Sequence, residues 1–284
     1  MLGTMTQRRW LVTGCSTGLG RALAENLAHT GEQAVLTARD PRTLADLAEA
    51  HPEHIAVAAL DVRDEAACRA AVELAGQRFG GVDVLVNNAG YGQFGSVEEV
   101  SEQEVRDQLE TNLLGPWRLL RMVLPQWRER RGGHAVLVSS TCGSMALPGL
   151  SAYTASKFAL EGLGEALAAE AAHLGVKTTI LQLGGFSTNY GKSLAEPATR
   201  IADYAAVEDG ILLGTRNLAE YEFTSSPQLF ALLVRKVAAM AQPPLRVPFG
   251  RDIEVFLAPA LAARQAAFEQ AIASGAHLPE WVSP

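Results

Sequence analysis

Short apolar runs that alternate with helical patterns are the feature of this chain that most limits how it can fold. Runs such as VDVLV and HAVLV are apolar without strict alternation, as expected for strands that are covered on both faces. The stretches between most runs have the longer period of amphipathic helices. The predicted strands span residues 10–13, 34–38, 55–62, 82–87, 135–140, 176–183 and 245–249.

This order of elements predicts an α/β fold. We expect residues 1–284 to form a single doubly wound, Rossmann-type domain, with a seven-stranded parallel sheet and helices on both faces. Start signals place helices after Asp40-Pro41, after Asp64 and at Ser151, the last running to about His173. Two regions fall outside the pattern, a loose N-terminal tail at 1–7 and a substrate-covering helical excursion at 189–244 with a helix near 227–240.

Composition excludes several classes of protein. The chain has a net charge of −7 and no basic stripe, so we expect no nucleic-acid partner. Its three cysteines, Cys15, Cys68 and Cys142, are widely spaced and form no CxxC pair, which argues against a disulfide framework and a metal site. No signal peptide or membrane-spanning run is evident. We therefore expect a cytoplasmic protein without a membrane partner.

A glycine-rich turn follows the first predicted strand and opens a helix. Gly14, Gly18 and Gly20 stand in the run TGCSTGLG, which also holds Ser16, Thr17 and Leu19. Glycines allow a tight turn and a close approach to a pyrophosphate, and the N-terminus of the helix offers N–H groups and a positive dipole end. The spacing GxxxGxG differs from the commoner GxGxxG. The turn predicts a dinucleotide site, although an ordinary turn remains the alternative.

Tyr153 and Lys157 are four residues apart on a predicted helix, so their side chains share a face. A neighbouring ammonium favours the ionised form of a phenol, so we expect Lys157 to lower the pKa of Tyr153 toward a useful range for proton transfer. The alternative is a surface lysine beside a core tyrosine.

In these motifs the chain resembles the short-chain dehydrogenase/reductase family. The resemblance rests on TGCSTGLG at 13–20, LDV at 60–62, NNAG at 87–90, TNLLG around Asn112, Ser140, and YTASK at 153–157. It covers residues 8–190 well, and YTASKFALEG is most similar to the hydroxysteroid, retinol and carbonyl reductase-like members. The family's PGxVxT stands here as LGGFST, with Leu183 in place of proline.

The resemblance implies a catalytic tetrad and a set of cofactor contacts. Tyr153 would transfer the proton, Ser140 would hydrogen-bond the substrate oxygen, Lys157 would bind ribose and tune Tyr153, and Asn112 would hold a water on the proton path. The cofactor would lie against Gly14, Ser16, Thr17, Gly18, Leu19, Gly20, Arg39, Asp61, Val62, Asn88, Ala89, Gly90, Tyr153, Lys157, Gly184, Phe186 and Thr188.

The end of the second predicted strand bears on the choice of cofactor. An acidic residue there binds the ribose of NAD, but this chain has Ala38 at that position and Arg39 next to it. A guanidinium matches a 2′-phosphate, whereas Asp40 before a proline is more simply a helix cap. We expect NADP(H) to be preferred and NAD(H) to remain possible, with a solvated Arg39 as the alternative.

The expected substrate is a hydrophobic ketone or secondary alcohol, such as a polycyclic or aromatic one. Apolar residues available for its pocket lie at 91–94, 146–150, 190, 194, 201, 204 and 211–213, although they could simply cover the sheet. By resemblance, helices near 101–128 and 152–173 would form a homodimer or homotetramer. The alternative functions are a redox-neutral epimerase or dehydratase of the same fold and a noncatalytic nucleotide-binding sensor.

Overall fold

The seven predicted strands are all present in the computed structural model, which describes residues 7–275. They form one sheet in the order β3-β2-β1-β4-β5-β6-β7, and every neighbouring pair is parallel. The strands are β1 (Arg9–Val12), β2 (Gln33–Ala38), β3 (Ile55–Ala59), β4 (Val84–Asn87), β5 (Gly133–Val138), β6 (Val176–Leu183) and β7 (Arg246–Phe249). The predicted doubly wound parallel sheet is therefore confirmed.

The order of the strands reverses between β1 and β4. The chain runs outward from β1 through β2 to β3, then crosses back to place β4 on the other side of β1. Ligands of open α/β sheets bind outside the carboxyl ends of the strands at such a switch point. The topology thus places a site beyond Val12 and Asn87 before any side chain is considered.

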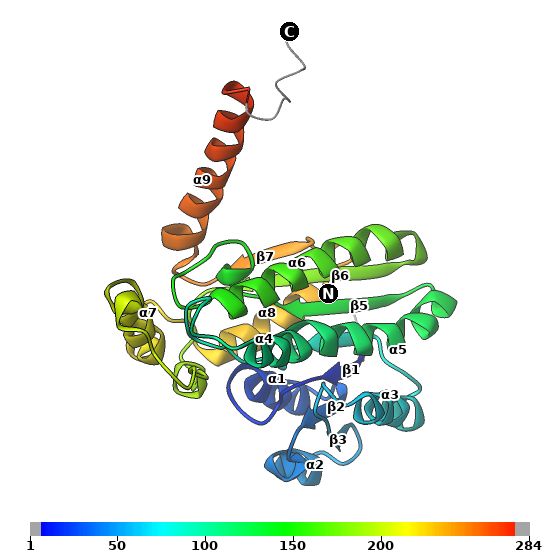
Figure 1. The fold of residues 1–284 in the computed structure, drawn as a ribbon. Helices are drawn as coiled ribbons and strands as arrows, with labels where there is room; N and C mark the ends of the chain where they lie inside the picture. The colour runs from blue at the N-terminus through cyan, green and yellow to red at the C-terminus, as the bar shows by residue number, and fades with distance from the viewer. Residues whose placement is uncertain (1–6, 276–284) are drawn as a thin grey trace.

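Helices cover both faces of the sheet, and one long helix leaves it. Figure 1 shows α9 extending away from the body of the molecule, past the end of the sheet that carries β7. The α-helices are α1 (Gly18–His29), α2 (Ala45–Ala50), α3 (Glu65–Phe79), α4 (Glu102–Leu109), α5 (Gly115–Arg130), α6 (Ser151–Ala171), α7 (Ala205–Arg216), α8 (Pro227–Ala239) and α9 (Ile253–Ala273). Within residues 7–275, no helix is both long and apolar enough to cross a membrane.

Two apolar layers hold the sheet, one on each face. Side chains of a strand alternate between faces, so Trp10 and Val12 pack with α1 and α8, whereas Leu11 packs with α3, α5 and α6. All three side chains are buried. Strands covered on both sides need apolar residues at every position, which explains why the strand runs lack strict alternation.

The boundaries differ from the predicted ones in several places. β3 ends at Ala59 rather than at residue 62, because the chain turns into the N-terminal cap of α3 at Asp64. Ser151 is the first residue of α6, and its hydroxyl donates to the carbonyl of Gly95. Within the predicted excursion 189–244, α8 packs on α1, so only the part before Pro227 lies along the cavity described below. No pattern in the sequence predicts α9, and residues 1–6 of the predicted tail lie outside the described residues.

A buried histidine in β5 makes stability depend on pH. His134 is 3% exposed, its Nε2 lies 3.0 Å from the hydroxyl of Thr179, and its Nδ1 has no partner among the described residues. Burial lowers the pKa of His134 to about 3. The folded state therefore holds the neutral ring, while an unfolded chain binds a proton below about pH 6.5.

We expect the free energy of unfolding to fall as pH drops from about 6.5 toward 3, with a contribution from this ring approaching about 1.4 kcal/mol per pH unit. Urea unfolding at several pH values measures it. His134→Gln should flatten the profile in that window, and His173→Gln, at an exposed position, should not. Equal slopes for wild type and His134→Gln would contradict the assignment.

Candidate active site

One cavity of about 1110 Å³ lies at the carboxyl ends of the strands, at the switch point. Every predicted site residue except Asn112 lines it. The lining thus joins the glycine-rich turn after β1, the ends of β2 to β6, and the start of α6. These segments are far apart in sequence, and the sheet brings them together.

The glycine-rich turn is packed so closely that side chains are excluded from it. Gly14 has a φ of +73°, and a Cβ on it would lie 2.9 Å from the Cα of Ala89. A Cβ on Gly20 would lie 2.1 Å from the carbonyl oxygen of Gly14 and 2.6 Å from the side-chain amide nitrogen of Asn88. The first turn of α1 is therefore pressed against the end of β1.

Side chains at the ends of β1 and β4 join this turn to the loop after β4. The Thr13 hydroxyl accepts hydrogen bonds from the main-chain N–H groups of Asn88 and Ala89, both at 3.0 Å. The Asn88 amide donates to the carbonyls of Thr13 and Gly14. The predicted Asn88 therefore shapes the turn, and Thr13, which sequence reasoning did not select, anchors it. Its signal was a hydroxyl directly before the first glycine.

The N-terminus of α1 is left open toward the cavity. The N-cap residue Thr17 makes no side-chain capping hydrogen bond. The first N–H groups of a helix have no partner within the helix, so those of α1 are available to a ligand, and the dipole favours an anion there. The crowded glycines and the uncapped helix fit a dinucleotide pyrophosphate.

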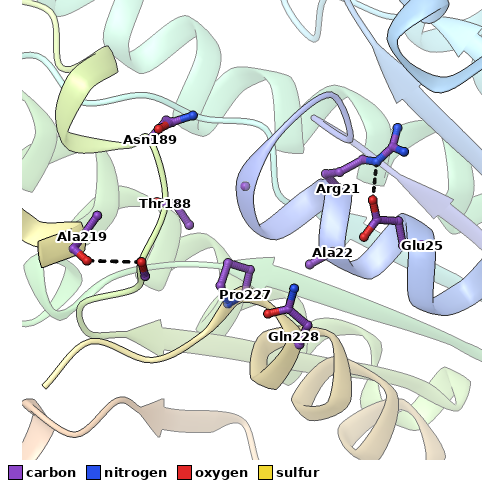
Figure 2. Close-up of a pocket in the computed structure, with 10 residues that line it drawn as sticks. Arg21, Ala22, Glu25, Thr188, Asn189, Ala219, Pro227 and Gln228 are labelled. Atoms are coloured by element: carbon purple, nitrogen blue, oxygen red, sulfur yellow. Dashed lines mark hydrogen bonds and ion pairs between the residues drawn. The ribbon is translucent and has the colours of Figure 1, made fainter. Parts of the chain in front are cut away.

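A smaller hollow of about 320 Å³ lies on the outer side of the same turn. Figure 2 shows Arg21 and Glu25 of α1 on one wall, Thr188 and Asn189 opposite, and Pro227 at the start of α8. Arg21 is already paired with Glu25 and Asp46. Thr188 lines both hollows and would lie 3.6 Å from a Cβ on Gly18. The predicted contact Thr188 therefore closes over the start of α1.

Tyr153 and Lys157 lie together at the wall of the main cavity. Both are buried, and the Lys157 ammonium lies 5.7 Å from the centre of the Tyr153 ring while donating to the carbonyl of Val138 at 2.8 Å. Burial raises the pKa of Tyr153 to about 12 and lowers the pKa of Lys157 to about 8. The direction of the Tyr153 pKa is thus opposite to the expected one, because loss of water is the largest influence on the phenol and the groups that lower its pKa are Ser140 and Tyr190 rather than Lys157.

Ser140 ends the segment after β5 and lines the cavity beside Tyr153. Its hydroxyl accepts a hydrogen bond from the N–H of Cys142 at 3.2 Å and also acts to lower the pKa of Tyr153. The rival Ser139 is buried, and its hydroxyl is without a hydrogen-bond partner in the described part of the chain. Both serines line the cavity, but only Ser140 interacts with Tyr153.

Asn112 lies behind the cavity wall in a π-helical turn, Glu110–Leu114, between α4 and α5. Its side chain holds both main-chain groups of Tyr91 and donates to the hydroxyl of Ser156 at 3.0 Å. A Cβ on Gly90 would lie 3.0 Å from Asn112 and 3.8 Å from the Lys157 ammonium nitrogen. Asn112 is therefore next to Lys157 without lining the cavity. Mid-helix asparagine is locally unfavourable, and here three hydrogen bonds compensate for it.

The far end of the cavity, beyond β2 and β3, holds charged side chains. Arg39 is exposed and, within residues 7–275, its side chain makes no hydrogen bond or ion pair. Asp40 caps the turn that follows and pairs with Arg42, as expected for a cap. Asp61 pairs with Arg63, whose hydrogen bonds hold the pKa of the carboxyl below its usual range.

The loop after β6 is fixed by a residue far away in the sequence. Asp252 accepts a hydrogen bond from the N–H of Gly185 at 2.8 Å, and a Cβ on Gly184 would collide with its carboxylate. Phe186 turns its ring into the core, stacked on Phe249 at 6.0 Å, so only its main chain remains for a ligand. Asp252 was missed, because no motif surrounds it and it approaches only through the end of β7.

The predicted pocket wall is partly correct. Tyr91, Leu147, Leu150, Tyr190 and Ile211 line the cavity. Tyr204 and Ile201 do not, because they lie at the rim, where the Tyr204 hydroxyl donates to Glu98 and the Ile201 N–H donates to Glu99. Leu218, Tyr221 and Phe223 also line it from within the predicted excursion 189–244, whereas Met145 and Phe256 lie outside every segment predicted for the wall.

An ion cluster holds α7 at this rim. The buried carboxylates of Glu99 and Glu208 both bind Arg200, each at 3.1 Å. Glu99 also accepts from the N–H of Ser96 at 2.9 Å. Burial and the nearby Glu99 raise the pKa of Glu208, so the two carboxyls share the single guanidinium with one of them biased toward its neutral form. The cluster ties the cavity's cover to the loop after β4.

Comparison with known proteins supports the family. The family model for short chain dehydrogenases matches residues 8–199. The chain belongs to the short-chain dehydrogenase family. Oxidoreductase BOA17 of Botryotinia fuckeliana is 36% identical over 86% of this chain and 89% of its own length. Retinol dehydrogenase 8 of Bos taurus is 37% identical over 84% of this chain and 80% of its own length. The protein is thus an oxidoreductase of this family.

Several solved structures have the same fold. A short-chain dehydrogenase from Streptomyces avermitilis has a TM-score of 0.87 and 37% identity, covering 96% of this chain and 99% of that one. An alcohol dehydrogenase from Thermococcus sibiricus, complexed with 5-hydroxy-NADP, has a TM-score of 0.71 and 26% identity over 86% and 97% of the two chains. A 3-ketoacyl-(acyl-carrier-protein) reductase from Brucella melitensis, complexed with NADH, has a TM-score of 0.72 and 26% identity over 88% and 100%. These relatives support a nicotinamide cofactor for the chain.

The crowding at Gly20 gives a test of whether the glycine-rich turn at 14–20, here called the glycine cradle, binds the cofactor. Gly20→Ala places a methyl group against the Gly14 carbonyl and Asn88, so the turn must shift, and we expect the Kd for NADPH to rise at least about 10-fold. Fluorescence titration of NADPH measures it. Gly162→Ala is the matched control, because nothing lies within 4 Å of its added Cβ in α6, and it should bind NADPH as wild type does. Unchanged binding by Gly20→Ala would contradict a cofactor site at this turn.

Proposed function

We propose that this protein is an NADP(H)-preferring ketoreductase or alcohol dehydrogenase that acts on hydrophobic ketones and secondary alcohols. The observation that carries the proposal is the convergence of Ser140, Tyr153 and Lys157 on one wall of a cavity whose other end is the glycine cradle. A proton-transferring phenol is thereby joined to a dinucleotide site by a continuous space.

The bound nicotinamide would supply the hydride to a carbonyl carbon, or accept it from an alcohol. In the direction of reduction, Tyr153 donates its phenolic proton to the carbonyl oxygen, and the Ser140 hydroxyl donates a hydrogen bond to the same oxygen. Lys157, held by the carbonyl of Val138, keeps a positive charge next to the phenol as it loses its proton. Asn112 holds the main chain of Tyr91 at the cavity wall through hydrogen bonds with its N–H and its carbonyl.

The apolar part of the cavity supports a hydrophobic substrate. Leu147 and Leu150 line it from the loop before α6, and Ile211 lines it from α7. Phe223 lies in the segment before α8, and Phe256 lies in α9. Binding pockets of this type gain affinity from apolar burial and specificity from a few polar groups. A cavity of about 1110 Å³ has room for a ketone of several rings beside the cofactor.

The environment of Arg39 supports NADP(H). Its guanidinium lines the cavity unpaired within the described residues, and Asp40, the competing acid, is held by Arg42. A free guanidinium matches the 2′-phosphate that distinguishes NADP(H).

The proposed chemistry is tested by NADPH and NADH oxidation at 340 nm across a panel of apolar ketones and quinones. We expect turnover by wild type and a loss of about 100-fold or more in kcat for Tyr153→Phe, which keeps the ring but removes the proton. Tyr204→Phe, at the rim, is the matched control and should keep full activity. Full activity of Tyr153→Phe, or reaction only with small polar sugars, would contradict the proposal.

Cofactor preference is tested by Arg39→Ala. Loss of a charge-assisted hydrogen bond should raise KM for NADPH about 10- to 100-fold and leave KM for NADH nearly unchanged. Arg42→Ala, three residues away and paired with Asp40, should change neither. An equal effect of Arg39→Ala on both cofactors would show that Arg39 does not read the 2′-phosphate.

A homodimer or homotetramer and a cytoplasmic location stay predictions. Trp117 of α5 is 47% exposed and Leu114 of the π-helical turn is 40% exposed, and buried contacts with a second copy would cover them. A monomer at micromolar concentration by light scattering would overturn the prediction of an oligomer.

A further inference from the structure

A second tyrosine faces Tyr153 inside the cavity, and neither the family resemblance nor the proposed roles account for it. The ring of Tyr190 lies 5.9 Å from the ring of Tyr153, centre to centre, at an angle of 49°. Both rings belong to a small apolar cluster with Phe94, Leu150 and Leu194. The Tyr190 ring therefore packs against the side chain of Tyr153, the proposed proton-transferring group.

The hydroxyl of Tyr190 is buried and lacks a hydrogen-bond partner of normal geometry within residues 7–275. A buried hydroxyl without a partner costs free energy, so its persistence in a packed wall needs a reason. The apolar neighbours in the cluster offer no acceptor. The groups that influence the pKa of Tyr190 are the Tyr153 side chain, whose ring lies 5.9 Å away, and the thiol of Cys142.

The main chain of Tyr190 is held by hydrogen bonds on both sides of its peptide groups. Its N–H donates to the Thr188 hydroxyl at 3.2 Å, and its carbonyl accepts from the N–H and hydroxyl of Ser193. Gly92 makes room for the side chain, because a Cβ there would lie 2.3 Å from the Tyr190 oxygen. The hydrogen bonds of its main chain thus set where the Tyr190 side chain begins, and the lack of a side chain at Gly92 leaves room for the hydroxyl.

The two phenols differ in what they can do with a proton. Burial raises the pKa of Tyr190 well above its ordinary value, so its hydroxyl remains a donor throughout the working range of pH. Burial also raises the pKa of Tyr153, and the hydroxyls of Ser140 and Tyr190 act to lower that pKa. A donor beside an oxygen that becomes negative favours the charged form.

We propose that Tyr190 is a positioning residue for the proton-transferring group, donating its hydroxyl hydrogen to the oxygen of Tyr153 when that phenol ionises. Hydrogen bonds of catalytic groups are often long before the reacting complex forms and shorten there. The Ser140 hydroxyl can then donate to the substrate oxygen, while the Tyr153 phenolate left after proton transfer accepts a hydrogen bond from Tyr190. The inference rests on the proposed function, because it takes Tyr153 as the acid and base.

The test compares wild type with Tyr190→Phe, which keeps the ring contact and removes only the hydroxyl. In alcohol oxidation, which requires ionised Tyr153, we expect the rising limb of kcat/KM against pH to move upward by about one pH unit. Below that limb, the rate at a fixed pH should fall about 10-fold, with KM for the cofactor unchanged. Tyr204→Phe, whose hydroxyl binds Glu98 at the rim, should leave the profile in place.

A second readout needs no turnover. Carbon-13 labelling of the tyrosine ring carbon that carries oxygen reports ionisation of each phenol by NMR, and Tyr153→Phe assigns its signal. The apparent pKa of Tyr153 should rise by about one unit in Tyr190→Phe and stay constant in Tyr204→Phe.

An unchanged Tyr153 signal and an unchanged pH limb in a folded Tyr190→Phe would overturn the inference. A change confined to KM for the ketone would also overturn it, because it would make Tyr190 a substrate contact. If Tyr153→Phe instead retained full activity, the proposed function would fail, while the NMR titration would still decide whether Tyr190 bonds to Tyr153.

Discussion

The close approach of the glycine-rich turn to the loop after β4 is the constraint on which the rest of the site depends. Gly20 lies so near the carbonyl of Gly14 that a methyl group does not fit, and Asn88 bonds to that same carbonyl. Thr13 completes the connection by accepting from the loop's main chain. The ends of β1 and β4 are thus bound together at the point where strand order reverses. The cavity, the open helix end and the wall that carries Tyr153 are all placed relative to that junction.

Burial sets the electrostatics of the other wall. Tyr153 and Lys157 lose water together, so the phenol resists ionisation and the ammonium releases its proton more readily. The proposed role of Tyr153 as acid and base would therefore need donors near its oxygen, and the Ser140 hydroxyl is one group that lowers the pKa of Tyr153. The same burial lowers the local dielectric around Tyr153 and Lys157, which strengthens each polar contact made there. Low solvent access and local hydrogen bonding act in opposite directions on one pKa.

The sheet and most of the candidate site could be predicted from the sequence because both depend on local patterns of residues. Buried parallel strands need continuous apolar runs, and the glycine turn and the Tyr153–Lys157 pair are short motifs, so all could be predicted. Asp252 could not, because it reaches Gly185 only through the packing of β7 beside β6. The predicted direction of the shift in the Tyr153 pKa was also wrong, because a motif shows which groups are neighbours but not how much water they lose on folding.

The π-helical turn at Glu110–Leu114 has a consequence for the length of the chain. A π turn takes one more residue than an α turn, so α4 and α5 meet with their faces out of the register that one unbroken α-helix would have. Substitution at Asn112 removes its hydrogen bonds but leaves that offset in place. If the turn became regular α-helix with the same number of residues, every later side chain of α5 would be rotated by about 100° relative to α4, whereas deletion of one residue would leave those side chains close to their present directions. The wide turn thus accommodates one additional residue, and its conformation keeps the faces of α4 and α5 in their present relation.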